Sequence, residues 1–464
     1  MKIDVLVAEI GSTTTVVNAF DHLESDSPVF LGQGQAPTSV KEGDVNIGLQ
    51  AAIEDMKKNL HIENEKLEYT NMLATSSAAG GLRMTVHGLV YDMTVKAAKE
   101  GALGAGANIH LITAGKLSKV DMIKLDRIKP NIILIAGGVD YGERETALYN
   151  SELIAASDLD IPVIYAGNIA VADDVKLIFE SYSKEKNLHL VPNVYPKIDI
   201  LNIEPTREVI QDIFEKHITE AKGMEKIREM VNGPIIPTPG AVMKASKLLK
   251  DEIGDLVTID VGGATTDIHS VTEGTEKVNK ILVEPEPVAK RTVEGDLGVF
   301  INKRNIVDII KIEKLEKELN MTPEDIEKFT NSDIAIPETE EHKRFIERLT
   351  KEAVIVSINR HAGGYRTYFG GKSDTLAFGK DLTAVKWIVG TGGALTRLTA
   401  REEILNSISQ FNRADKLLPT AEAKILIDND YIMASLGVLS SLNKEAAIKL
   451  LLKSLKFNEK TTGG

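Results

Sequence analysis

One pattern occurs twice in this chain, in segments that begin at residues 4 and 256. Residues 4–19 (DVLVAEIGSTTTVVNA) read as an apolar strand ending in Glu9, a turn of glycine and hydroxyl residues, and a second strand-like run. Residues 256–271 (LVTIDVGGATTDIHSV) repeat this order, with Asp260 at the strand end. Short runs rich in Val and Ile and bounded by Gly or Asp are typical of buried strands. The repetition predicts two similarly built lobes, each opened by a glycine hairpin.

The rest of the chain alternates strand-like and helix-like stretches. Residues 132–135 and 163–165 read as buried strands, and residues 206–230 have apolar side chains at helical spacing. Near Thr322, the order Thr-Pro-Glu-Asp predicts a helix start. Strands alternating with helices favour an α/β fold.

The domain boundary is expected within residues 234–245, where Pro and Gly concentrate and Pro239-Gly240 can turn the chain. This division predicts three parts: an N-terminal lobe at 1–240, a C-terminal lobe at 241–457 and a flexible tail at 458–464.

Charge and cysteine content exclude several classes of protein. The net charge is -13, with 68 Asp and Glu scattered among 55 Lys and Arg, which argues against binding to nucleic acid or to an anionic membrane. The absence of cysteine excludes disulfides, iron–sulfur clusters and thiol nucleophiles. We find no signal peptide pattern and no apolar run long enough to span a membrane, so a cytoplasmic location is expected.

Both hairpins have the composition of a phosphate site. A glycine turn lets backbone N–H groups approach phosphate oxygens, and Ser or Thr adds hydroxyl donors. A carboxylate repels phosphate directly, so its role is through Mg²⁺, usually with water interposed, or in orienting an attacking water. We therefore predict Glu9 and Asp260 as the catalytic and Mg²⁺-positioning residues. The predicted phosphate-binding residues are Gly11, Ser12, Thr13, Thr14, Gly262, Gly263 and Thr265.

A third glycine turn follows the apolar run in residues 386–398 (KWIVGTGGALTRL) and opens onto a helix pattern. Bare backbone and a helix start can pack closely on ribose or adenine. The predicted adenosine side of the site consists of Gly390, Gly392 and Gly393.

Three polar features are explained by structure alone at least as well as by a functional role. His361, flanked by Arg360 and Arg366, is expected in a solvated turn. The run 267–272 is close to a cobalamin-binding pattern, but Thr272 stands where that pattern has glycine, so we interpret it as coincidence. Ser76-Ser77 before Gly80-Gly81 either lines the cleft or only turns the chain.

The three glycine elements, in this order, resemble the actin/Hsp70/sugar-kinase ATPase superfamily, whose two phosphate loops and adenosine loop match residues 9–15, 260–267 and 389–394. The resemblance implies two actin-like ATPase (ribonuclease H-like) lobes with the cleft for ATP and Mg²⁺ between them. Its two connecting helices would correspond to residues 137–152 and 429–440. One departure is Glu9, because the first loop usually begins with Asp.

Several longer stretches are similar to one branch, the MutL/GlmL-type accessory proteins of adenosylcobalamin-dependent glutamate mutase, which are distinct from mismatch-repair MutL. This resemblance implies an ATP-dependent, chaperone-like reactivating factor that lets damaged cobalamin leave, with the mutase subunits as partners. The stretches are residues 74–84, 130–142, 161–168, 292–299, 374–383 and 387–398.

Three alternatives share the predicted fold. The main one is a small-molecule kinase with Asp260 or Asp267 as base. An electron-transferring activator of radical dehydratases would need cysteine for its cluster, and this chain has none. A filament-forming relative would need a polymer interface, and nothing in the sequence marks one.

Overall fold

The computed structural model describes residues 1–39, 43–77, 82–105, 107–220, 223–224, 226–233, 235–334, 336–368, 374–411 and 415–457. The expected tail at 458–464 lies outside these ranges. The contacts divide the chain into two compact units. Unit 1 comprises Met1–Ala19, Gly32–Gly240 and Glu284–Pro287, and unit 2 comprises Phe20–Leu31, Ala241–Val283 and Val288–Gly464. Within the described residues, no helix has the length and apolar character needed to cross a membrane.

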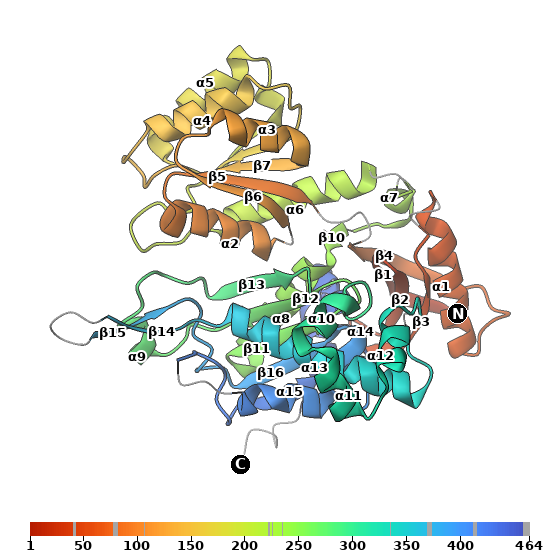
Figure 1. Cartoon of the computed structure of the whole chain (residues 1–464). Helices are drawn as coiled ribbons and strands as arrows, with labels where there is room; N and C mark the ends of the chain where they lie inside the picture. The colour runs from red at the N-terminus through yellow and green to blue at the C-terminus, as the bar shows by residue number, and fades with distance from the viewer. Residues whose placement is uncertain are drawn as a thin grey trace. The chain divides into compact units, whose positions relative to one another are not determined.

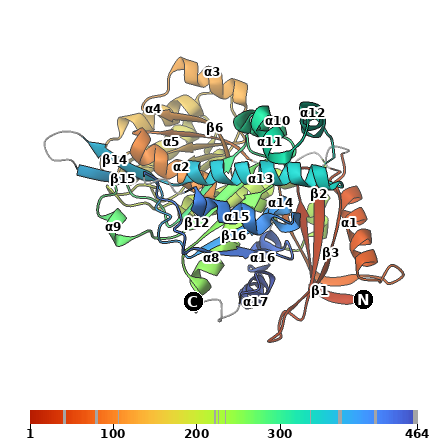
Figure 2. The same cartoon turned by 60° about the horizontal axis from the view of Figure 1, so that its bottom comes forward.

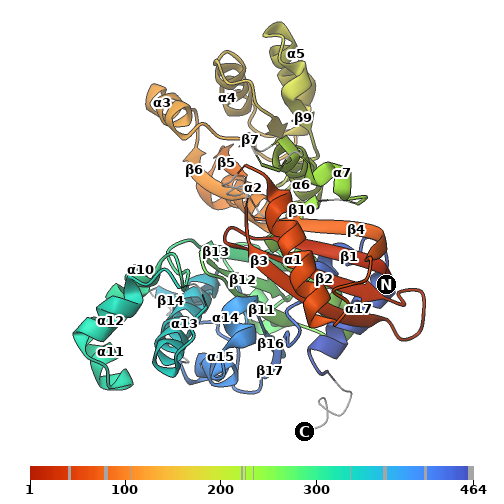
Figure 3. The ribbon, with the colours of Figure 1, turned by 90° about the vertical axis from the view of Figure 1, so that its right-hand side faces the viewer.

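The mixed α/β architecture predicted from the sequence is confirmed. One five-stranded sheet has the order β10-β4-β1-β2-β3, and β4 runs parallel to both β1 and β10. Helix α1 (Val45–Asn59) lies over β3, where Gly34 lets the backbones approach closely (Figure 3). The strands are β1 (Lys2–Ile10), β2 (Thr14–Asp21), β3 (Val29–Pro37), β4 (Glu68–Ser76) and β10 (Ile235–Pro237).

A second five-stranded sheet, in unit 2, has the order β13-β12-β11-β16-β17. Counted within each sheet, both orders read third, second, first, fourth, fifth, and in both the fourth strand is parallel to the first and the fifth. The repetition seen in the two hairpins therefore extends to whole sheets. The strands are β11 (Leu256–Val261), β12 (Thr266–Val271), β13 (Ala289–Glu294), β16 (Trp387–Thr391) and β17 (Lys424–Ile427).

Helices cover the second sheet and enclose a large apolar core, which includes Ile259, Ile268 and Val354. The long helix α13 (Glu340–His361) packs against β12 and runs along α15 (Figure 2). A two-stranded sheet joins β14 (Gly364–Tyr368) and β15 (Asp374–Phe378). The other helices are α8 (Thr238–Ile253), α9 (Glu276–Asn279), α10 (Lys303–Ile310), α11 (Ile312–Leu319), α12 (Pro323–Thr330), α14 (Gly392–Arg397), α15 (Arg401–Gln410), α16 (Met433–Leu439) and α17 (Lys444–Ser454).

A third five-stranded sheet, all parallel, is inserted between β4 and β10 with the order β6-β5-β7-β8-β9. This is the doubly wound order 2-1-3-4-5. Helices α3, α4 and α5 lie on one side of it and α2 and α6 on the other (Figure 1). Its strands are β5 (Arg83–Gly88), β6 (Asn108–Ala114), β7 (Ile132–Ile135), β8 (Val163–Tyr165) and β9 (Leu188–Leu190). The α-helices of this part are α2 (Lys96–Gly104), α3 (Lys119–Ile128), α4 (Glu145–Ala155), α5 (Ala172–Ser181), α6 (Glu204–Glu220) and α7 (Ile227–Met230), and the short helices are η2 (Tyr91–Val95), η3 (Ile169–Val171) and η4 (Glu185–Asn187).

Two predictions about helices were wrong. Pro239-Gly240 does not turn the chain but lies in the first turn of α8, because proline fits the start of a helix, where its missing N–H is not needed. Residues 137–152 do not form one connecting helix: α4 begins only at Glu145 and packs on β5, β7 and α5 of the inserted sheet.

Other local predictions were confirmed. Thr322 caps α12 by accepting a hydrogen bond from the N–H of Asp325, with proline in the first turn. A helix predicted within residues 429–440 is present as α16. Gly437 brings this helix close to the start of α8, because a Cβ there would lie 2.0 Å from the carbonyl oxygen of Ala241.

Candidate functional site

The first predicted phosphate turn joins β1 to β2. The N–H of Gly11 donates to the carbonyl oxygen of Thr14 at 3.0 Å and closes the turn. The side chains of Ser12 and Thr13 at its tip are exposed. Thr38, directly after β3, holds the turn from behind: its N–H donates to the carbonyl of Thr13 at 3.0 Å and its hydroxyl to that of Gly11 at 2.8 Å. The turn is therefore fixed while its hydroxyl groups face solvent.

The carboxylate of Glu9 lies at the end of β1 and is only 6% exposed. The amide of Asn18 on β2 donates to its Oε1 at 3.4 Å. The end of β4 lies beside the turn, since the N–H of Ser77 donates to the carbonyl of Ile10 at 2.9 Å and the hydroxyl of Ser12 donates to that of Ser77 at 3.3 Å. Ser77 thus borders this turn, whereas Gly80-Gly81 lies outside the described residues.

The second predicted phosphate turn joins β11 to β12 and is closed in the same way. The N–H of Gly262 donates to the carbonyl of Thr265 at 2.9 Å. Backbone N–H groups of Phe300 and Ile301 donate to the carbonyl of Gly263 at 2.9 and 2.8 Å. Gly298 lies against this turn so closely that a Cβ there would be 2.2 Å from the carbonyl carbon of Ala264. The 295–302 loop is thus the support of the second turn.

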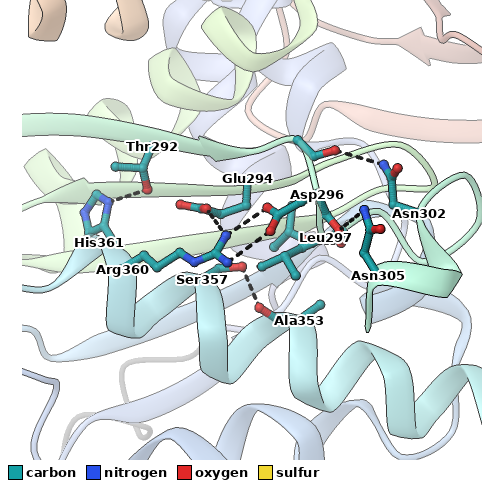
Figure 4. A network of polar contacts seen from close by, with 12 residues as sticks. Thr292, Glu294, Asp296, Leu297, Asn302, Asn305, Ala353, Ser357, Arg360 and His361 are labelled. Atoms are coloured by element: carbon teal, nitrogen blue, oxygen red, sulfur yellow. Dashed lines mark hydrogen bonds and ion pairs between the residues drawn. The ribbon is translucent and has the colours of Figure 1, made fainter. Parts of the chain in front are cut away.

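Helix α13 holds this supporting loop from its other side (Figure 4). Arg360 donates to Glu294 at 2.6 Å and to Asp296 at 2.8 and 3.0 Å, and side-chain hydrogen bonds to Arg360 lower the pKa of Asp296. Across the loop, the amide of Asn302 donates to the carbonyls of Ala264 and Gly295 at 2.8 and 2.9 Å. The second turn therefore has a continuous polar connection to α13.

The third predicted element, the β16–α14 turn, lies directly against Asp260. Asp260 and Thr391 are register neighbours on β11 and β16. Gly392 has φ +86°, and a Cβ there would be 2.4 Å from Oδ1 of Asp260 and 2.6 Å from the N of Val261. Only glycine fits this conformation and this space without strain. At Gly393, in contrast, a Cβ would meet nothing within 4 Å, so its backbone is open.

The structure places the predicted site residues in two groups. Unit 1 holds Glu9 with Gly11–Thr14, and unit 2 brings together Asp260, the Gly262–Thr265 turn and the 390–393 turn. Among the described residues, no group of three or more His, Asp or Glu side chains could hold a metal ion. The roles of these residues in binding and catalysis stay predictions.

Asp428 is a polar residue of this region that the sequence reasoning missed. It follows β17 and is 1% exposed. The hydroxyls of Thr391 and Ser454 donate to it at 3.0 and 2.7 Å, and the N–H of Met433 at the start of α16 at 2.9 Å. Burial raises its pKa, although these hydrogen bonds oppose the shift. The signal was present, because Asp428 follows an apolar run as Glu9 and Asp260 do.

His361 is not in a solvated turn, as expected from the sequence, but ends α13 and is 2% exposed. Its Nδ1 is 2.9 Å from the hydroxyl of Thr292 (Figure 4). Its Nε2 is 2.8 Å from the hydroxyl of Ser270. Burial, with nearby Lys290 and Lys380, holds its pKa well below the usual value. The prediction failed because flanking arginines do not reveal which side of a helix packs on a sheet.

His269, the histidine of the cobalamin-like pattern, is fully buried within β12. Burial lowers its pKa to about 3. Because the ring of His269 is fully buried on β12, it cannot reach a bound cofactor. This agrees with the interpretation of the cobalamin-like pattern at 267–272 as coincidence.

Comparison with known proteins gives a family for the whole chain. Residues 5–455 match the family model described as MutL protein. Protein MutL of Clostridium tetanomorphum is 36% identical over 464 residues, covering 97% of this chain and 98% of the relative.

Solved structures are similar only at low identity. Nucleotide-free acetone carboxylase is 10% identical with a TM-score of 0.40, over 94% of this chain and 70% of the other. Glycerol dehydratase reactivase is 10% identical with a TM-score of 0.36, over 95% of this chain and 100% of the other. Similarity at these TM-scores supports no conclusion about activity, whereas the match to the family model and the identity to the relative each extend over nearly the full length. The chain therefore belongs to the MutL family.

Proposed function

We propose that this chain is an ATP-dependent reactivating factor for adenosylcobalamin-dependent glutamate mutase, which promotes release of damaged cobalamin. Its family membership supports this proposal. The observation that carries it is the repeated turn. In two sheets of the same strand order, a carboxylate lies near the end of the first strand, and a glycine two residues later closes the turn by donating its N–H to the carbonyl three residues further on. Such a pair suits a nucleotide held from two sides, and the proposed location is the cytoplasm.

In this proposal the two turns hold the phosphates. Glycine backbone at Gly11, Gly262 and Gly263 admits phosphate oxygens close to N–H groups, and the exposed hydroxyl of Thr13 adds a donor. The hydroxyl of Ser12 would have to release Ser77 before it could donate to phosphate. The adenosine side falls to the 390–393 turn, where Gly393 leaves its backbone open. Thr14 and Thr265 complete the predicted set.

Mg²⁺ fits the oxygen donors present, since Glu9 and Asp260 each end a strand directly before a turn. Mg²⁺ prefers oxygen ligands and keeps several waters, so two carboxylates acting through water are sufficient. When bound, the ion would neutralise charge on the phosphates. The carboxylates of this chain would position the ion and the attacking water.

A nucleotide can reactivate a partner enzyme only if it binds one arrangement of the two units better than another. Hydrolysis would then return the protein to its starting state. In such a cycle the partners are the mutase subunits, and ATP hydrolysis is the only chemistry that this chain performs.

The environment of Asp267 argues against this residue as the base of a small-molecule kinase. A kinase base must reach the substrate hydroxyl. Asp267 is 4% exposed, and both of its oxygens accept hydrogen bonds from Arg291 or Thr265. It is therefore poorly placed to accept a proton from a substrate.

The deciding experiment uses glutamate mutase inactivated as its hydroxocobalamin complex. This protein and free adenosylcobalamin are added, and mutase activity is followed with and without ATP and Mg²⁺. We expect recovery only with ATP and Mg²⁺, and none with Asp260→Ala. Asp251→Ala, which removes an exposed carboxylate of α8, is the matched control and should reactivate normally.

Two outcomes would contradict the proposal in different ways. Full activity of Asp260→Ala would overturn the site assignment. No recovery by the unmodified protein despite nucleotide binding would overturn the choice of partner, and would direct the search to another mutase or to a small-molecule phosphoryl acceptor.

A further inference from the structure

A chain of polar contacts lies behind the second turn. Arg291 on β13 donates to Oδ1 of Asp267 from Nε at 2.9 Å and from Nη2 at 2.6 Å. The hydroxyl of Thr265 donates to Oδ2 of the same carboxylate at 2.8 Å. Arg291 is 2% exposed and Asp267 is 4% exposed, whereas Thr265 lies at the partly exposed turn. The contacts therefore run from the buried sheet to the proposed nucleotide site.

Because of the donors and acceptors around it, the hydroxyl of Thr265 can only accept a hydrogen bond from a ligand. An ionised carboxylate only accepts hydrogen bonds, and a guanidinium only donates them. A hydroxyl has one proton and two lone pairs. Since the proton of Thr265 is directed to Asp267, only its lone pairs remain for a ligand. It can receive a hydrogen bond from a water but cannot donate one to a phosphate oxygen.

We infer that Arg291 is a positioning residue that acts through Asp267 to hold the Thr265 hydroxyl as a hydrogen-bond acceptor for a water at the nucleotide site. The inference rests on the proposed ATPase function and changes the role predicted for Thr265, which was donation to phosphate. Phosphate contacts of the second turn then come from its glycine backbone.

The choice of arginine follows from the geometry. Two N–H groups of one planar guanidinium meet the same oxygen, so Asp267 cannot rotate without losing both bonds, and a lysine ammonium lacks this fork. The register neighbour of Arg291 on β12 is His269, which burial keeps neutral near pH 7, with a pKa of about 3. It therefore adds no second cation beside Asp267.

The water that Thr265 accepts from can belong to bound Mg²⁺ or can be the attacking water. The test measures binding of adenylyl imidodiphosphate, a non-hydrolysable ATP analogue, with Mg²⁺ and with EDTA, and measures ATP hydrolysis separately. The full-length protein is compared with Thr265→Val, which loses the hydroxyl at nearly constant shape, and with Thr265→Ser, which keeps it.

If the water is bound to Mg²⁺, Thr265→Val should weaken analogue binding about tenfold with Mg²⁺, the size of one hydrogen bond, and leave binding in EDTA unchanged. If it is the attacking water, both affinities should stay unchanged and hydrolysis should fall about tenfold or more. Thr265→Ser should behave like the unmodified protein in either case. If Thr265→Val weakened analogue binding equally with Mg²⁺ and with EDTA, the inference would be wrong, because the Thr265 hydroxyl would then donate directly to a phosphate oxygen.

The role of Arg291 is tested by Arg291→Lys, which keeps the charge and removes the fork. It should reproduce the pattern of Thr265→Val, and the double variant should lose no more than either single one, because both changes break one chain of contacts. Additive losses would overturn the positioning role. If Arg291→Lys does not fold, Asp267→Asn serves in its place. Failure of the unmodified protein to bind the analogue would instead remove the proposed function itself.

Discussion

The two glycine turns share one closing hydrogen bond but are held in place by different means. The first turn is held from behind by Thr38, whose N–H and hydroxyl donate to the carbonyls of Thr13 and Gly11. It is also bordered by Ser77, which accepts a hydrogen bond from the hydroxyl of Ser12. The second is held by backbone N–H groups of the 299–301 segment and by the amide of Asn302. The strand order sets where a turn lies, whereas the neighbouring segment of each lobe decides how firmly it is held and which groups it exposes.

The carboxylates that precede the two turns also have different surroundings. Glu9 is buried and accepts a hydrogen bond from Asn18, whereas Asp260 is only partly buried and contacts the backbone at Gly392. Replacing Asp260 should therefore reduce activity with little loss of stability, whereas replacing Glu9 should reduce both.

The largest effect is expected for Asp260→Asn, which should lower kcat for ATP hydrolysis by about 10²–10³-fold, the range for losing one group that acts on transition-state charge. The melting temperature should stay nearly unchanged, because the side chain is partly exposed and its shape is kept. Steady-state kinetics and thermal unfolding measure the two.

Glu9→Gln is the companion variant. It should lower kcat and also the melting temperature, because the glutamine amide brings two buried N–H donors to a site where the carboxylate only accepts hydrogen bonds. If Asp260→Asn hydrolysed ATP normally, the catalytic role of Asp260 would be wrong. If both variants lost the same stability, the proposed difference between the two carboxylates would be wrong.

The next effect concerns the contact between the third turn and Asp260. Gly392→Ala forces a Cβ to within 2.4 Å of Oδ1 of Asp260 at φ +86°. We expect the free energy of unfolding to fall by about 1–3 kcal/mol, the cost of one strained backbone position, together with weaker nucleotide binding. Urea unfolding measures the first and calorimetry the second.

Gly393→Ala is the matched control, because its Cβ would meet nothing within 4 Å. Its stability should stay within about 0.5 kcal/mol of the unmodified protein. Equal destabilisation by both substitutions would contradict the close packing of Gly392 on Asp260.

Both hairpins, the strand–turn–helix at 387–397 and the helix cap at Thr322 could be predicted from the sequence. These features depend on residues close together in the chain, such as apolar runs, glycines and a capping threonine. The strand order of the two sheets was not predicted, because pairing of β4 with β1 joins segments far apart in sequence.

Residues that support the site were missed for the same reason. Thr38 and Arg291 act on turns from other strands, and nothing in the residues around them identifies the carbonyl or carboxylate that each will meet. The strands at 132–135 and 163–165 were predicted, but not the separate parallel sheet to which they belong. The local sequence of a strand does not show which sheet it will join.

Acid should affect stability through four buried histidines, His87 in unit 1 and His269, His342 and His361 in unit 2. Burial lowers the pKa of His342. Burial lowers the pKa of His87 to about 4 and that of His269 to about 3, and holds that of His361 well below the usual value. Unfolded histidine titrates near pH 6.5, so below this pH the unfolded chain binds more protons than the folded one. The stabilisation is complete above pH 6.5 and is lost as pH falls toward 4, at up to about 1.4 kcal/mol per pH unit for each ring.

Urea unfolding at pH 7 and pH 5 measures this loss, and hydrogen exchange shows in which unit it occurs. Unit 2 should lose protection first, because it carries three of the four rings. His269→Leu should reduce the difference in stability between the two pH values. The substitution removes no hydrogen bond within the described part of the chain, where neither ring nitrogen of His269 has a partner. An unchanged pH dependence in that variant would show that His269 titrates normally.

The smallest effect concerns Thr38, which holds the first turn from behind. Thr38→Val removes the hydroxyl that donates to Gly11 and lies 2.9 Å from the hydroxyl of Thr15. The free energy of unfolding should fall by about 1 kcal/mol, the usual size of one hydrogen bond, and Thr38→Ser should restore most of it.

The 299–301 segment holds the second turn through backbone N–H groups, so deleting a side chain in that segment should not loosen it. If Thr38→Val left both stability and nucleotide affinity unchanged, the first turn would be held by its own closing hydrogen bond, and the contrast between the two turns would not extend to their energetics.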